Sequence, residues 1–106
     1  MKGGNVALDS MMAERLVEFF DEHRPEWAAH SYLPPRTTAV LAIVAARGAG
    51  YEVPTVADAF FKSQYTVRTY HRDTARYCGT SAPGLERQTL RHLLLNDPQL
   101  LAELLG

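Results

Sequence analysis

The chain has 106 residues, which is the size of one domain rather than two. Its composition, 46% hydrophobic and 22% charged, is typical of a globular protein and excludes a wholly disordered chain. The single cysteine, Cys78, excludes an internal disulfide, and no apolar run approaches the ~18–20 residues of a membrane span. We therefore expect a single domain over residues 1–106, located in the cytoplasm and without a membrane partner.

The net charge of −1 conceals an uneven distribution along the chain. Residues 1–30 hold three basic and six acidic residues, whereas residues 61–92 hold six basic and two acidic residues, a net charge of +4. Nine of the eleven basic residues are arginine, whose planar guanidinium suits bidentate recognition of phosphate or carboxylate. The basic second half is therefore expected to bind a partner. The alternative explanation of the many arginines is a GC-rich genome.

The first elements are predicted from apolar spacing. Apolar residues recur every three or four positions, which predicts an amphipathic helix over about residues 10–23, capped by Asp9 or Ser10. Pro25 is expected to stop this helix or to open a short turn after it. Pro34-Pro35 is expected to break the chain again.

The stretch from Thr37 to Arg47 is compatible with two secondary structures. Its β-branched residues fit a buried strand, but its four alanines and the Gly48-Ala49-Gly50 that follows favour a buried helix. Eleven residues is also long for a buried strand. We therefore expect a helix.

Capping residues predict the remaining helices, after a loop over residues 48–54. Thr55 is expected to cap a short helix, with Asp58 in the capping-box position, and Ser63 to cap a longer helix over Gln64–Tyr77. Residues 80–84 are expected to form a turn. Further helices are expected over residues 85–95 and 100–105, the last one capped by residues 96–98. The predicted fold class is all-α, with five or six short helices and a helical pair at about residues 55–77.

One segment of this pair has a recognisable pattern. A small alanine permits close crossing of two helices, a hydroxyl residue caps the second helix, and apolar residues hold the second helix on the first. In these respects the segment resembles the helix-turn-helix of bacterial transcriptional regulators. The matching residues are Val56, Ala57, Phe60, Ser63, Thr66, Val67 and Tyr70.

The segment departs from that pattern at two positions of the turn. Phe61 stands where the family usually has glycine, because the backbone there often adopts a positive φ that is costly for a bulky residue. Lys62 stands where the family usually has an apolar residue. These departures leave open whether the turn is longer or differently shaped.

The resemblance implies duplex DNA as a partner. The second helix would enter the major groove by its amino-terminal half, where glutamine can pair with adenine and arginine with guanine. Other cations would contact phosphates. The candidate DNA-binding residues are Lys62, Gln64, Tyr65, Arg68, Thr69, Arg72 and Arg76. The alternative interpretation is that the three arginines form a solvated helix face, with Asp73 paired locally.

Eight leucines lie between residues 90 and 105. They either fill the core or form an apolar patch for self-association or for a partner protein. We expect that two short helices cannot hide all eight. The sequence therefore predicts a homodimer with Leu94, Leu101 and Leu105 at its interface.

The sequence offers little for catalysis. It has no HExxH motif and no glycine-rich phosphate loop, and His71 is two helical turns from Cys78. We expect no enzyme, no metal and no cofactor. Two functions remain: a DNA-binding transcriptional regulator, or a small helical antiactivator that inhibits a transcription factor, such as a quorum-sensing regulator, by protein–protein binding. The net charge of +4 over residues 61–92 favours the DNA-binding regulator. The near-neutral charge of the whole chain, Phe61 in the turn and the leucine-rich end favour the antiactivator.

Overall fold

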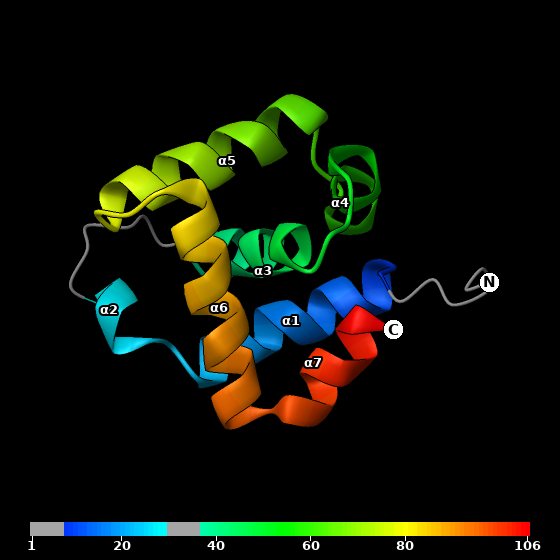
Figure 1. Ribbon diagram of the computed structural model, residues 1–106. Coiled ribbons are helices and arrows are strands. Elements are labelled where there is room, and N and C mark those ends of the chain that lie inside the picture. The colour runs from blue at the N-terminus through cyan, green and yellow to red at the C-terminus, as the bar shows by residue number, and fades with distance from the viewer. Residues whose placement is uncertain (1–7, 30–36) are drawn as a thin grey trace.

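The computed structural model describes residues 8–29 and 37–106, and within these ranges every regular element is a helix (Figure 1). Six of these helices have eight or more residues and α2 has four, so the all-α prediction is confirmed. The expected break at Pro34-Pro35 lies outside the described residues. In chain order the helices are α1 (Ser10–Glu22), α2 (Glu26–Ala29), α3 (Thr37–Gly48), α4 (Val53–Phe60), α5 (Gln64–Tyr77), α6 (Ala82–Asn96) and α7 (Pro98–Leu105).

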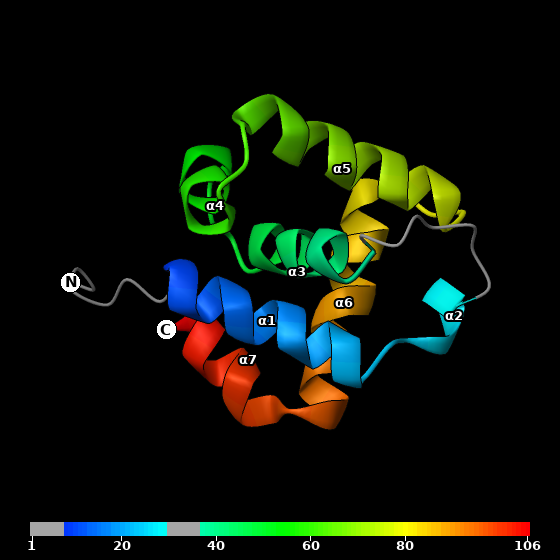
Figure 2. The same ribbon diagram turned by 180° about the vertical axis from the view of Figure 1, so that it is seen from behind.

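Helix α3 forms the centre of the molecule, with the other long helices arranged around it (Figures 1 and 2). It contacts α1, α4, α5 and α6, and its residues from Leu41 to Ala46 are inaccessible to solvent. The alanines allow close approach of neighbouring helices, while the β-branched residues fill the spaces between them. The prediction of a buried helix over Thr37–Arg47 is therefore correct.

Helix α6 crosses the carboxyl end of α3 at Gly48. A β-carbon added at Gly48 would lie 3.0 Å from Cβ of Glu86 and 3.1 Å from Cδ1 of Leu90. A larger residue at this position would require the Glu86 and Leu90 side chains to shift. A smaller apolar cluster of Val40, Val44, Ala75 and Leu85 fills the space where α3, α5 and α6 meet.

The predicted starts of α4 and α6 are wrong, and α7, capped by Asp97 within the predicted residues 96–98, begins at Pro98 and not at residue 100. Helix α4 begins at Val53 after Glu52, so Thr55 lies inside the helix instead of capping it. Pro54 occupies the first turn, where its missing N–H costs nothing because no intrahelical acceptor is available there.

The predicted turn over residues 80–84 is also corrected. Helix α6 already begins at Ala82, because the Ser81 hydroxyl accepts a 3.0 Å hydrogen bond from the Gly84 N–H. Pro83 again occupies the first turn. Glycine and proline here open a helix and do not interrupt one.

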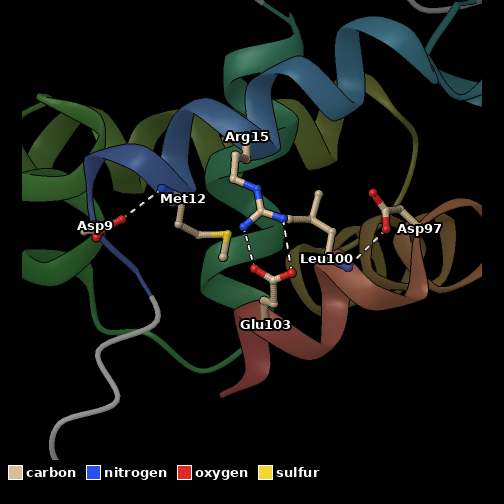
Figure 3. A network of polar contacts seen from close by, with 6 residues as sticks. All are labelled: Asp9, Met12, Arg15, Asp97, Leu100 and Glu103. Carbon is tan, nitrogen blue, oxygen red and sulfur yellow. Dashed lines mark hydrogen bonds and ion pairs between the residues drawn. The ribbon is translucent and has the colours of Figure 1, made fainter.

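The first and last helices, α1 and α7, lie side by side and are joined by a bidentate ion pair (Figure 3). Both terminal guanidinium nitrogens of Arg15 in α1, Nη1 and Nη2, donate to the carboxylate of Glu103 in α7. This hydrogen bonding raises the pKa of Arg15 and lowers the pKa of Glu103. The same view shows the Asp9 and Asp97 carboxylates capping α1 and α7, where they accept from the Met12 and Leu100 N–H groups.

No helix in the described ranges has the length and apolar character needed to cross a membrane.

Candidate nucleic-acid interface

Helices α4 and α5 are joined by the three residues 61–63. Phe61 adopts the left-handed conformation, with φ 55° and ψ 46°, and lets the chain change direction directly after α4. The Lys62 N–H donates to the Ala57 carbonyl and the Phe61 N–H to the Asp58 carbonyl, which together form a Schellman motif. The turn is therefore short, and Phe61 itself takes the positive φ.

Ser63 starts α5 as the sequence predicts. Its hydroxyl accepts a 3.0 Å hydrogen bond from the Thr66 N–H and lies 2.8 Å from the Thr66 hydroxyl. Val67, one turn later, is inaccessible to solvent and belongs to the same core cluster as Ala57 and Phe60. Tyr70 is partly buried against that cluster. These contacts hold α5 on α4 in the predicted way.

The buried and exposed faces of α5 are clearly separated. His71, Thr74 and Ala75 face inward toward α3 and α6 together with Val67. Positions 65, 68, 72 and 76 follow the three- and four-residue spacing of one helix face, and all four are exposed. The outer face of α5 therefore carries one tyrosine and three arginines along its length.

Six of the seven predicted DNA-binding residues are exposed, and only Thr69 is half-buried. Tyr65 has 74% of its surface exposed, which is high for an aromatic residue. The exposed residues are Lys62, Gln64, Tyr65, Arg68, Arg72 and Arg76. The structure thus places all of them on the turn or on the solvent side of α5.

The electrostatic setting of the three arginines differs. Arg72 Nε lies 3.2 Å from the Asp73 carboxylate, so one of the three has a local acidic partner, as the alternative interpretation expects. Among the described residues, no ion pair involves Arg68 or Arg76. These two charges are therefore available to an anionic ligand.

His71 fixes α5 to α6 from the inner side. Its Nε2 lies 3.1 Å from a Glu86 carboxylate oxygen and 3.3 Å from the Ala82 carbonyl oxygen. The side chain is nine-tenths buried. Sequence spacing alone does not reveal this contact, because the partner residues lie on another helix.

A second basic surface lies on α6 beside the end of α5. Arg87 and Arg91 are exposed one turn apart and line a shallow hollow of about 510 Å³ with Thr80, Gly84 and Gln88. The hollow is open and its two arginines face solvent. It extends the positive charge of the second half beyond α5.

The carboxyl-terminal leucines divide into buried and exposed residues. Leu93, Leu100 and Leu104 are buried in the core. The three predicted interface residues differ, since Leu94 and Leu105 are 55% and 58% exposed whereas Leu101 packs partly against the core. Leu95 is exposed as well.

In the described part of the chain, no three His, Cys, Asp or Glu side chains are grouped as metal ligands. Comparison of the chain with models of protein families, with curated proteins and with solved structures gives no match.

Proposed function

We propose that this protein is a small cytoplasmic transcriptional regulator that binds duplex DNA through α4 and α5, as a helix-turn-helix unit. The observation that carries the proposal is the exposed arginine face of α5 beside a short, capped turn. Exposed positions in the amino-terminal half of such a helix are the ones that reach base edges in the major groove.

The backbone of the turn supports this proposal. Three residues separate α4 from α5, which is a usual length for a helix-turn-helix. Phe61 takes the left-handed conformation that glycine usually supplies in the family. The positive φ at Phe61 therefore supports the proposal, although the residue type departs from the family pattern.

Charge supports the proposal too. Lys62, Arg68 and Arg76 are exposed, and among the described residues none of them is in an ion pair. Arginine and lysine contacts to phosphate supply most of the sequence-independent affinity for DNA. We assign Gln64, Tyr65, Arg68, Thr69 and Arg72 to the groove, and Lys62 and Arg76 to phosphates.

The test is binding to genomic duplex fragments at two salt concentrations, measured by gel shift or fluorescence anisotropy. We expect affinity to fall steeply with salt because bound counterions are released. Arg68→Ala and Arg72→Ala are each expected to weaken specific binding by about 1–3 kcal/mol. Arg24→Ala is the matched control, because Arg24 is exposed and lies just after α1, outside the α4–α5 unit.

Absence of salt-dependent binding to any fragment would contradict the proposal. Equal losses for Arg24→Ala and Arg68→Ala would also contradict it, since they would show only a general charge effect. Circular dichroism of each variant checks that the helices are retained.

The exposed leucines favour the second candidate function, an antiactivator that binds a transcription factor and no DNA. Leu94 and Leu95 are exposed at the end of α6, and apolar residues of this kind are common in protein interfaces. A salt-independent complex with a protein, lost in Leu94→Glu but retained in Arg68→Ala, would support this function instead.

A further inference from the structure

Phe61 projects from the turn between two hollows of the surface. It lines both of them, and 81% of its surface is exposed. A large apolar side chain in this position contributes little to the core. Aromatic residues, phenylalanine included, are enriched in protein interfaces relative to the rest of the surface.

The larger hollow, which we call the α1–α4 groove, has an apolar floor. It measures about 390 Å³ and is lined by Ala13 and Val17 of α1, Ala39 of α3, and Ala59 and Phe60 of α4. Figure 2 shows α4 beside the first turns of α1. The part of α1 that lines the groove, residues 10–18, is about 12 Å long at 1.5 Å per residue. This length fits about two turns of a partner helix.

Carboxylates line both hollows beside Phe61. Glu14 and Glu18 are exposed along the α1 side, and Asp9 and Asp58 line the neighbouring hollow on the other side of Phe61. Lys62 is the single basic residue that lines either hollow. Among the described residues, no ion pair involves any of the four carboxylates. The surroundings of Phe61 are therefore apolar at the centre and negative at the rim.

We propose that the α1–α4 groove binds a basic amphipathic helix of a protein partner. The apolar face of that helix would cover Val17, Ala59 and Phe61, and its lysines or arginines would pair with Glu14 and Glu18. A cation over the Phe61 ring adds a favourable cation–π contact. This mode of binding is the helix-in-groove arrangement, in which apolar anchors give affinity and rim charges give specificity.

Charge complementarity selects this occupant over two others. Duplex DNA would bring phosphates against four carboxylates, which repel them. A second copy docked symmetrically would bring the same four carboxylates of each copy together. The groove and the basic face of α5 thus take partners of opposite charge. The inference does not depend on DNA binding, because none of its residues lies on the outer face of α5.

The experiment uses the full chain and a synthetic peptide of about 18 residues, long enough to form a helix on binding. The peptide contains only leucine and lysine, with the leucines on one helical face. Two control peptides are used. The first has the same composition in scrambled order and so lacks the apolar face, and the second has glutamate in place of lysine. Affinity is measured by anisotropy of the labelled peptide, and the site by amide chemical shifts in nuclear magnetic resonance spectra.

We expect the amphipathic basic peptide to bind and to shift the amides of Val17, Ala59 and Phe61. Glu14→Lys with Glu18→Lys is expected to weaken binding about tenfold or more, because two attractive pairs become repulsive. The matched control is Asp21→Lys with Glu22→Lys. It makes the same change in net charge at exposed positions of the same helix, outside the groove. We expect it to change affinity by less than about threefold.

Phe61→Gly is expected to weaken peptide binding about tenfold while leaving the helices folded. The proposal is overturned if the scrambled peptide binds equally well, if the two charge-reversed variants lose affinity equally, or if the shifted amides lie on α5 or α6. It is also overturned if Phe61→Gly binds as tightly as the unmodified protein. A duplex DNA probe separates the two proposals, because DNA bound through α5 and Lys62 should shift the amides of α5 and leave those of Val17 and Ala59 unshifted.

Discussion

Phe61 has the left-handed backbone conformation that glycine has at the ends of two other helices. Helices α3, α4 and α5 all end with the same pair of hydrogen bonds, and the residue of positive φ is Gly50, Phe61 and Gly79 respectively. The left-handed region costs an ordinary L-residue about 1–2 kcal/mol. With 81% of its surface exposed, Phe61 recovers little of this by burial. Strain at an exposed aromatic residue fits a role in binding better than a role in folding.

Phe61→Gly is therefore expected to stabilise the protein. Glycine removes the strain of the left-handed conformation, which is a gain in stability, and increases the entropy of the unfolded chain, which is a smaller loss. The free energy of unfolding should therefore rise by about 0.5–1 kcal/mol. The melting temperature should rise by a few degrees, measured by circular dichroism or calorimetry. Phe61→Ala is the control, because it removes the ring but retains the β-carbon that causes the strain. A melting temperature for Phe61→Gly no higher than that for Phe61→Ala would contradict the strain, and a Phe61→Ala protein that melts below the unmodified one would show that the ring stabilises the fold.

The helices show which local signals can be read from a sequence. The hydroxyl of Ser63 caps α5 at the predicted residue, and the helix ends at Tyr77 as expected, with Gly79 taking the positive φ after it. The predicted starts of α4, α6 and α7 lie too late in the chain because Pro54, Pro83 and Pro98, read from the sequence alone, indicate a loop or a cap. Proline is compatible with the first turn of a helix, so its presence there does not fix the boundary.

The packing of α5 on α4 is tested at Val67. This residue is fully buried, so Val67→Asp places a charge where no partner is available and should cost about 3–5 kcal/mol or more. For a protein of this size that is a large part of the total stability. Val67→Ala is the graded control, with an expected loss of about 1.5–3 kcal/mol from lost apolar burial. Urea denaturation followed by circular dichroism measures both. A Val67→Asp protein as stable as Val67→Ala would show that this site is open to water.

Seen as a whole, the molecule has surfaces of different character. The outer face of α5 is basic, the α1–α4 groove is apolar with a negative rim, and the ends of α6 and α7 expose leucines. The unequal charge of the two halves of the sequence predicts the first of these surfaces. It does not predict the groove, whose lining comes from residues 10–18, 39 and 59–62. Only the packing of α1 against α3 and α4 brings these residues together.

Which of the carboxyl-terminal leucines are exposed also depends on packing that the sequence does not reveal. Sequence spacing shows that eight leucines are too many for two short helices, but not which of them point outward. Leu101 packs partly against the core, whereas Leu94, Leu95 and Leu105 are exposed. Leu105 is about 10 Å along α7 from the turn that follows Leu95, at 1.5 Å per residue. A self-contact that used all three would therefore extend along the whole of α7.

We expect the protein to form a homodimer in solution through this surface. Each leucine removed from water contributes about 1.5–3 kcal/mol, and a two-fold arrangement lets one surface cover its own copy. Leu94→Glu with Leu105→Glu should therefore yield a monomer by sedimentation, with the helical circular dichroism retained because both side chains are exposed. The matched control is Met11→Glu with Tyr77→Glu, which adds the same charge at exposed apolar positions of α1 and α5 and should remain dimeric. Sedimentation of the unmodified protein as a monomer at micromolar concentration would refute the dimer. A monomer from the control pair would place the self-contact on α1 or α5, and loss of helicity in the leucine variant would show that these leucines stabilise the fold itself.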